Sequence, residues 1–143
     1  MHRLIFDPAR PIDTEAMPWI PTGPGKSFRP LRFAADGWSE LMRLEPGSAV
    51  AAHRHTGEVH AFNLAGTREI FGTGERVGPG NYAYEPAGTI DGWAAIGDEP
   101  CVVHIKVTGT IEYYDQSFIR LTRDGQPNLF IFKHEIKYIV EES

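Results

Sequence analysis

Short runs rich in apolar residues make up most of the chain from Phe28 onward, and turn-forming segments separate them. Each run has the length typical of a β-strand, and no helical periodicity lies between the runs. The runs are RPLRFA, WSELMRL, AVAAHRH, VHAFNLA, TREIFG, NYAYEP, WAAIG, CVVHIKVTGTIEYY and NLFIFK. The turn-forming segments are ADG, EPGS, GTGE, GPGN, GDEP and RDGQ. This pattern predicts an all-β fold, an antiparallel sandwich or barrel.

The two ends of the chain depart from this pattern. Residues 1–26 contain closely spaced prolines, which exclude a long helix and predict an extended arm with one helical turn at DTEAM. The chain is therefore divided into a proline-rich N-terminal arm, residues 1–27, and a single β-barrel domain, residues 28–143. An arm of this kind is expected to pack across another subunit. The last segment, KHEIKYIVEES, predicts either a terminal strand or a short helix.

Composition narrows the possible functions. The chain has 143 residues, 41% of them hydrophobic, which is enough for one compact domain with its own core. A net charge of −5 without a run of like charges argues against nucleic-acid binding. No apolar run is long enough to cross a membrane, and the start of the chain is too polar for a secretory signal, so we expect a cytoplasmic protein. The single cysteine, Cys101, excludes an intrachain disulfide and a cysteine-based metal site.

Two glycine-containing segments resemble nucleotide-binding motifs but do not fit them. GPGKS at 23–27 lacks the first glycine of a phosphate-binding loop, because Ile20 stands there, so it predicts a plain loop. GTGERVG at 72–78 has the wrong glycine spacing for a dinucleotide fingerprint and lies between two short strands. This second segment therefore predicts a hairpin turn.

The segment HRHTGEVH at 53–60 concentrates three of the six histidines of the chain. On an extended strand His53 and His55 point the same way and lie about 7 Å apart, a spacing that suits two ligands of one metal. The TGE turn then brings His60 onto the neighbouring strand as a further ligand. Without thiolates, imidazole ligands suit Fe, Zn, Mn, Ni or Cu. Two surface histidines on an edge strand would give the same sequence, and this alternative stays open.

The surrounding residues resemble the two sequence motifs of the cupin superfamily. Cupins are small jelly-roll barrels with a metal in the barrel mouth. The first motif has a glycine, a His-x-His pair, a glutamate and a second glycine. The second has a glycine, a Pro-x-Gly segment and a histidine. The matching segments here are Gly47-SAVAA-HRH-TGEV-His60-AFNLA-Gly66 and Gly80-NYAYE-PAG-TI-Asp91. The resemblance implies a single-domain cupin jelly-roll β-barrel.

Two positions depart from the cupin pattern. His60 stands where the metal-binding glutamate is usual, and Asp91 stands where the third histidine is usual. The resemblance therefore implies a metal held by His53, His55 and Asp91, with His60 as a fourth ligand. Two histidines and one carboxylate with open positions are typical of non-haem Fe(II) oxygenases. Alternatively, Asp91 in TIDGW caps a turn by bonding to the backbone at Gly92 or Trp93.

Other side chains near the two motifs complete the expected site. Glu85 precedes the proline of the second motif and is expected to point to the cavity, where it orients a ligand or takes a proton. Glu58 stands in the turn and is expected to be exposed. The expected apolar wall of the substrate pocket consists of Phe62, Tyr82, Tyr84 and Trp93. The other histidines, His2, His104 and His134, are expected to lie outside the site.

The closer resemblance is to the small cupin dioxygenases that cleave a C–C bond beside a ketone, typified by 2,4'-dihydroxyacetophenone dioxygenase and the diketone-cleaving dioxygenase. The segments PLRFAADGW, HRHTGEVHAFNLAG and GNYAYEPAGT carry it. It implies Fe(II), a small aromatic or acyl substrate, O₂ as co-substrate and a homodimer. Zn, Ni and Mn are the alternative metals. The alternative functions are a non-catalytic zinc-binding sensor resembling the ChrR-type cupins, and a non-redox cupin isomerase.

Overall fold

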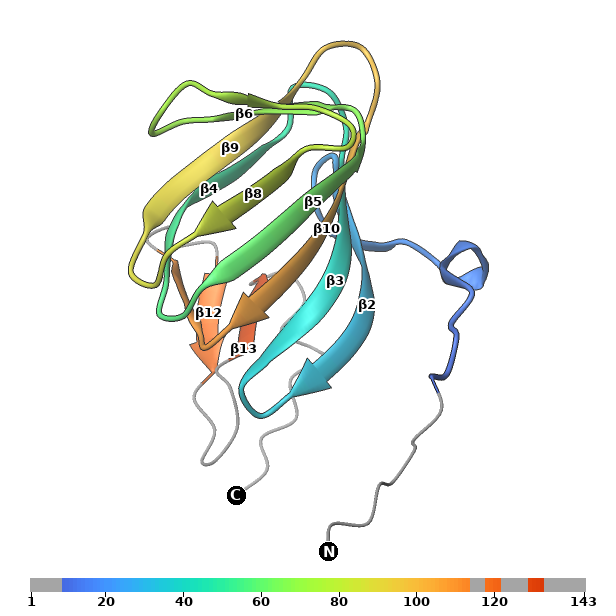
Figure 1. The fold of residues 1–143 in the computed structure, drawn as a ribbon, viewed down its shortest axis with the longest axis vertical. Helices are drawn as coiled ribbons and strands as arrows, with labels where there is room; N and C mark the ends of the chain where they lie inside the picture. The colour runs from blue at the N-terminus through green and yellow to red at the C-terminus, as the bar shows by residue number, and fades with distance from the viewer. Residues whose placement is uncertain (1–8, 114–117, 122–128, 133–143) are drawn as a thin grey trace, which may run out of the picture.

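Antiparallel strands make up nearly all the regular structure of this protein, which we describe from a computed structural model over residues 9–113, 118–121 and 129–132 (Figure 1). Within that part of the chain the one helical element is a 3-10 turn, η1 (Thr14–Ala16). It lies in DTEAM, where the sequence predicted a helical turn, and the side chain of Asp13 caps it by accepting a hydrogen bond from the Glu15 amide. No helix among the described residues is long and apolar enough to cross a membrane.

The first layer is a six-stranded sheet. Its strands in spatial order are β1 (Ile20–Gly23), β2 (Lys26–Ala34), β3 (Gly37–Leu44), β10 (Cys101–Thr108), β5 (Val59–Ala65) and β8 (Tyr82–Glu85). Strands β1 and β2 form a hairpin at GPGKS, where Gly25 has a φ of 68°. The predicted loop is thus a tight turn. Both β1 and the start of β2 precede residue 28, where the barrel domain was expected to begin.

The second layer is a five-stranded sheet that faces the first (Figure 1). Its strands in spatial order are β11 (Ile111–Tyr113), β4 (Ala49–His55), β9 (Ile90–Ile96), β6 (Thr67–Ile70) and β7 (Arg76–Val77). A separate hairpin is formed by β12 (Phe118–Leu121) and β13 (Leu129–Phe132). Strand β6 ends just before GTGERVG, β7 lies within it, and the two strands pair, so the predicted hairpin turn is confirmed. The segment KHEIKYIVEES lies outside the described residues.

The strand pairs are nested in the manner of a jelly roll. β3 pairs with β10, β4 with β9, β5 with β8, and β6 with β7, all antiparallel. The chain is therefore one long antiparallel hairpin that rolls over itself into two facing sheets. Backbone pairing among the described strands does not close the two sheets into a continuous barrel. The predicted all-β jelly roll is confirmed, as an open two-sheet form.

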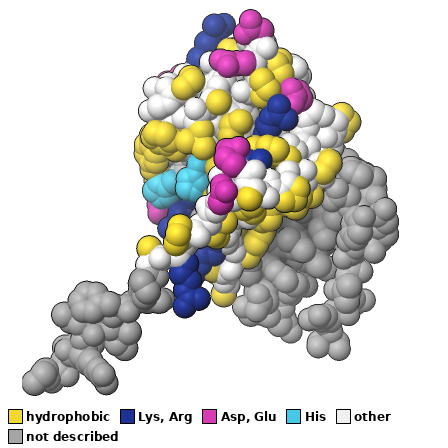
Figure 2. Space-filling model, turned by 90° about the vertical axis from the view of Figure 1, so that its right-hand side faces the viewer, with side chains coloured by type: hydrophobic (Ala, Val, Ile, Leu, Met, Phe, Trp, Pro, Cys, Tyr) yellow, Lys and Arg dark blue, Asp and Glu magenta, His cyan; other side chains and the backbone are white. Residues whose placement is uncertain are grey.

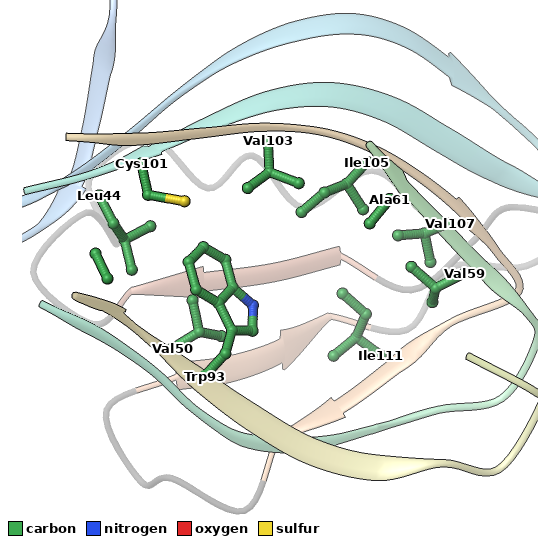
Figure 3. Packing of buried hydrophobic residues seen from close by; sticks show 11 residues of the cluster. Leu44, Val50, Val59, Ala61, Trp93, Cys101, Val103, Ile105, Val107 and Ile111 are labelled. Atoms are coloured by element: carbon green, nitrogen blue, oxygen red, sulfur yellow. The ribbon is translucent and has the colours of Figure 1, made fainter. Parts of the chain in front are cut away.

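Apolar side chains from both sheets fill the space between them (Figure 3). On β10 the inward positions alternate, and Cys101, Val103 and Val107 are each at most 2% exposed. Trp93 of β9 reaches from the second sheet toward these residues (Figure 3). His104 lies on the opposite face of β10 and is half-buried, as the sequence predicted. Burial of this apolar surface is the main force that holds the two layers together.

The N-terminal arm packs on its own sheet through Arg29 of β2. The guanidinium carbon of Arg29 lies 4.1 Å from the ring centroid of Trp19. Its Nε donates a hydrogen bond of 2.9 Å to the carbonyl oxygen of Met17. These contacts attach residues 13–19 to the outer face of the six-stranded sheet. Packing of the arm across another subunit, and the homodimer itself, stay predictions.

Candidate metal centre

Two buried histidines on β4 form the centre of the candidate site. His53 and His55 alternate with the exposed Ala52 and Arg54, so both point between the sheets, as their spacing predicted. They are 7% and 5% exposed, and their Nε2 atoms lie 2.8 Å apart. The structure thus brings the two histidines together inside the protein and not on an exposed edge.

The hydrogen bonds of His53 show which of its ring nitrogens carries the proton. Its Nδ1 lies 2.7 Å from the carbonyl oxygen of Ala51. Because a carbonyl oxygen only accepts, Nδ1 must carry the proton, and Nε2 of the neutral ring keeps its lone pair. Histidines that ligate metals are commonly oriented by such a bond from the other ring nitrogen.

Burial keeps both rings neutral. It lowers the pKa of His53, and it lowers the pKa of His55 to about 3, with a further contribution from the neighbouring His53. Neutral imidazole is the form that binds a metal. His55 also carries a buried Nδ1 without a hydrogen-bond partner in the described part of the chain. The pair is therefore a set of neutral nitrogen donors at neutral pH.

The spacing of the two nitrogens fits a shared ion. Two nitrogens that lie about 2.1 Å from one metal, at right angles to each other, are about 3.0 Å apart. The observed separation of 2.8 Å is close to this value. Among the described residues, however, no three histidine, cysteine, aspartate or glutamate side chains converge into a complete metal site. A third protein ligand therefore requires a side chain to move toward the pair.

Asp91 lies beside the histidine pair but is held by the backbone. On β9 it is the register partner of His53, and its charge acts on the pKa of that ring. Its Oδ1 accepts hydrogen bonds of 2.8 Å from the amides of Gly72 and Gly92. The bond to Gly92 is the backbone bond that the sequence left open as the alternative, although Asp91 lies in strand β9 and not in a turn. A Cβ at Gly72 would lie 2.5 Å from Oδ2, so the glycine also lets the backbone approach this carboxylate closely.

Glu85 faces the histidine pair from the six-stranded sheet. It stands on β8, and its Oε2 lies 3.8 Å from Nε2 of His55. Burial raises its pKa above the usual value, the nearby Arg68 lowers it, and Asp91 raises it further. The side chain is 26% exposed, so it lies at the edge of the protected region.

These side chains line a cavity of about 640 Å³ between the two sheets. His53, His55, Glu85 and Asp91 all contribute to its wall, and Trp93, Ile105 and Val107 are among its apolar residues. The volume is within the range of pockets that hold small molecules. The cavity is therefore large enough for a ligand next to the histidine pair.

His60 is not brought together with these residues. It lies on the outer face of β5, where its side chain is 38% exposed. Its Nδ1 bonds to the hydroxyl of Tyr82, and its Nε2 lies 3.2 Å from Oε1 of Glu58. The hydroxyl of Tyr84 donates to Oε2 of the same glutamate at 2.8 Å. Figure 2 shows histidine side chains at the surface next to apolar ones on this side of the molecule.

The expected substrate-pocket residues divide between the two faces. Trp93 is 6% exposed and forms part of the cavity wall. Tyr82 and Tyr84 border the cavity at β8, but 56% and 49% of each residue is exposed. Phe62 is 42% exposed and is not among the residues that line the cavity. Of the four aromatic residues, only Trp93 is both buried and in contact with the cavity.

Two charged residues at inward positions of the cavity wall were not predicted from the sequence. Glu40 shares the inward face of β3 with Trp38 and Met42, and burial raises its pKa to about 7, with a hydrogen bond to the Trp38 side chain acting in the opposite direction. Arg68 on β6 is 4% exposed. In both cases the available signal was a charged residue at an inward position of an alternating strand, as in WSELMRL, where Glu40 takes a place otherwise held by apolar residues.

Comparison with solved structures shows the same fold in proteins of different function. A cupin-like protein of unknown function from Ralstonia eutropha JMP134 is 24% identical, with a TM-score of 0.66 over 73% of this chain and 75% of that one. An acetylacetone dioxygenase from Acinetobacter johnsonii is 17% identical, with a TM-score of 0.64 over 95% and 92% of the two chains. The anti-sigma protein ChrR of Rhodobacter sphaeroides, solved in complex with SigE, is 20% identical, with a TM-score of 0.59 over 66% and 51%.

The sequence itself matches a family model over most of its length. No curated protein matches it significantly. The model that describes the ChrR cupin-like domain matches residues 9–110, which include both sheets of the sandwich up to β10 and every residue of the candidate metal centre. The chain therefore belongs to the ChrR cupin-like domain family.

Proposed function

We propose that this protein is a metal-dependent dioxygenase that cleaves a C–C bond next to a ketone in a small aromatic or acyl substrate. The observation that carries the proposal is the pair of buried, neutral histidines whose Nε2 atoms lie 2.8 Å apart in the wall of a cavity of about 640 Å³. A metal at this pair would face space for a substrate. The similarity in fold to the acetylacetone dioxygenase from Acinetobacter johnsonii supports the proposal.

In this proposal His53 and His55 hold Fe(II), and Asp91 supplies the carboxylate. The two backbone amides that donate to Oδ1 hold the Asp91 carboxylate beside the pair, and this side chain would have to shift toward the histidines to bind the metal. When bound, Fe(II) supplies Lewis acidity for the ketone and electrons for the reaction with O₂. His60 is not part of the proposed ligand set, because it lies on the outer face of β5.

Glu85 is the proposed acid–base residue. Enolisation of a ketone requires a group that removes a proton from the carbon next to the carbonyl. The carboxyl of Glu85 lies on the sheet opposite the histidines, 3.8 Å from Nε2 of His55 at the nearest oxygen. Burial raises its pKa, which makes the ionised form a stronger base. Trp93 and Ile105 are apolar residues of the same cavity wall.

The test is elemental analysis combined with oxygen uptake on untagged protein purified without chelator. We expect near-stoichiometric iron in the wild type, loss of iron in His53→Ala and His55→Ala, and reduced iron in Asp91→Ala. His104→Ala is the matched control, since this histidine faces away from the cavity, and it should keep its iron. Glu85→Gln should keep iron but lose oxygen uptake with aryl and acyl ketones.

A second candidate is a zinc-binding cupin without catalytic activity, and the match to the ChrR cupin-like domain model supports it. Such a protein would hold zinc tightly through the same histidines and bind a partner protein. The same experiment separates the two functions. Tightly bound zinc that depends on His53 and His55, with no oxygen uptake for any ketone, would favour the second candidate and exclude the first.

A further inference from the structure

We propose that the cavity binds a small organic carboxylate and that Arg68 is the residue that holds the carboxylate group. Under the proposed function, the substrate would then be a ketone that also carries a carboxylate. Only this last step rests on the proposed function, because binding of the anion follows from the environment of Arg68 alone.

Arg68 is a buried cation in the wall of the cavity. It is 4% exposed and lies on β6, opposite Ala95 of β9, so its side chain points between the sheets. Its guanidinium carbon lies 5.0 Å from the ring centroid of Trp93, which covers one face of the group. The guanidinium stays charged at this position, since arginine does not lose its proton in proteins.

The guanidinium is fixed on one side and has no anionic partner within the described part of the chain. Its Nε donates a 3.0 Å hydrogen bond to Oδ1 of Asn63. Across the described residues this is its one hydrogen bond, and it forms no ion pair there. Arg68 lines the cavity, and none of the described residues supplies an acceptor for its Nη atoms. A buried charge without a partner is costly, and a bound anion would remove that cost.

Asn63 holds this arrangement in place. It is fully buried, and its Nδ2 donates to the carbonyl oxygens of Gly66 and Val77 at 3.3 and 3.1 Å and contacts Sγ of Cys101 at 3.5 Å. With its donors used in this way, only Oδ1 is left to face Arg68. The Nε side of the guanidinium is thus anchored to the sheet, and the Nη side remains for a ligand.

Glu85 is the nearest competing carboxylate in the cavity. Its charge and that of Arg68 influence each other, but the two groups do not form an ion pair. A ligand carboxylate that reaches the Nη atoms can form the two parallel hydrogen bonds that guanidinium groups make with carboxylates.

The test compares two unreactive probes of the same shape, 3-phenylpropanoate and its neutral amide, by calorimetry. The full-length protein is used both as purified and after chelator treatment, so that binding to a metal is recognised separately. We expect the carboxylate to bind at least tenfold more tightly than the amide in both preparations. Arg68→Met should abolish this preference. Arg68→Lys should keep it in a weaker form, because lysine retains the charge but lacks the planar guanidinium that forms two parallel hydrogen bonds.

Arg76→Met is the matched control, because Arg76 also borders the cavity but its side chain is 72% exposed. This variant should keep the wild-type preference. Equal affinities for the two probes, no detectable binding of the carboxylate, or a preference that persists in Arg68→Met would each overturn the proposal. A protein without metal or oxygen uptake that still prefers the carboxylate would contradict the proposed function and leave the anion site intact.

Discussion

At the scale of single residues, Glu40 makes a testable contribution to stability. The carboxyl lies on the inward face of β3, and burial raises its pKa from 4.5 to about 7. In the unfolded chain it ionises near its ordinary pKa, whereas in the folded protein it keeps its proton up to about pH 7. Between these values the folded state binds more protons than the unfolded state, so the free energy of unfolding falls as the pH rises.

We therefore expect Glu40→Gln to stabilise the metal-free protein more at pH 8 than at pH 5. A pKa shift of this size changes the contribution of Glu40 to the free energy of unfolding by about 3 kcal/mol between the two ends of its titration. Urea unfolding of the wild type and the variant at both pH values measures it. Glu75→Gln, which changes an exposed carboxylate, should follow the wild type. A Glu40→Gln effect that is the same at both pH values would show that the carboxyl is not held in its neutral form.

The sequence predicted some site residues well and others not at all, and the reason is local in each case. His53 and His55 follow from the two-residue period of one strand, which the structure keeps. The inward position of Arg68 in TREI was a usable signal, but its contact with Asn63 follows from no sequence spacing. The face on which His60 lies depends on the register of β5, where polar Asn63 points inward and apolar Phe62 points outward. Hydrophobicity alone therefore gave no signal for the inward face of this strand.

At the scale of elements, the site depends on the pairing of β4 with β9. The register shifts between Val50 and His53, at an irregularity that faces Gly92. A Cβ at Gly92 would lie 2.5 Å from the carbonyl oxygen of Val50 and 3.0 Å from the amide of Ala52. Only glycine allows the two backbones to approach this closely. The approach sets the position of Asp91 relative to the two histidines.

We expect Gly92→Ala to destabilise the protein by roughly 1–3 kcal/mol, as overpacking typically does, and to lower its metal content. Urea unfolding and elemental analysis measure the two effects. Gly97→Ala is the comparison, since Gly97 follows the same strand with a φ of 84° and open space around it. This variant should lower the free energy of unfolding by about 1–2 kcal/mol, because alanine is strained at that φ, and it should leave the metal content unchanged. Full metal content in Gly92→Ala would mean that the β4–β9 spacing does not control the site.

The elements themselves were largely predictable, because the turns carry their own sequence signals. Strands β3, β4, β5 and β10 fall where short apolar-rich runs were identified. The exceptions are β1, β7 and β12, which lie outside those runs. Strands β1 and β7 are short and begin next to prolines or charged residues that hide their strand character. The resemblance to cupins implied a jelly roll, but the order of strands in each sheet was not predicted, since strand pairing between distant segments leaves no local trace.

At the scale of the whole molecule, the site is divided between the two layers. The proposed metal ligands on β4 and β9 and the proposed anion anchor on β6 belong to the five-stranded sheet. The ionisable carboxyls Glu40 and Glu85 belong to the six-stranded sheet. Metal binding thus depends on one layer, whereas proton transfer to or from a ligand depends on how the two layers are packed against each other.

Loosening the packing between the sheets should therefore reduce activity before it reduces metal content. Leu44 is fully buried in the core cluster between the layers, and it does not line the cavity (Figure 3). We expect Leu44→Ala to cost roughly 2–5 kcal/mol in the free energy of unfolding. At a temperature where the variant is folded, it should keep its metal and lose turnover. Leu64→Ala is the matched control, since this leucine is 49% exposed and its replacement should change stability by about 0.5 kcal/mol or less. A folded Leu44→Ala protein that loses its metal along with its activity would show that the metal centre, too, depends on both layers.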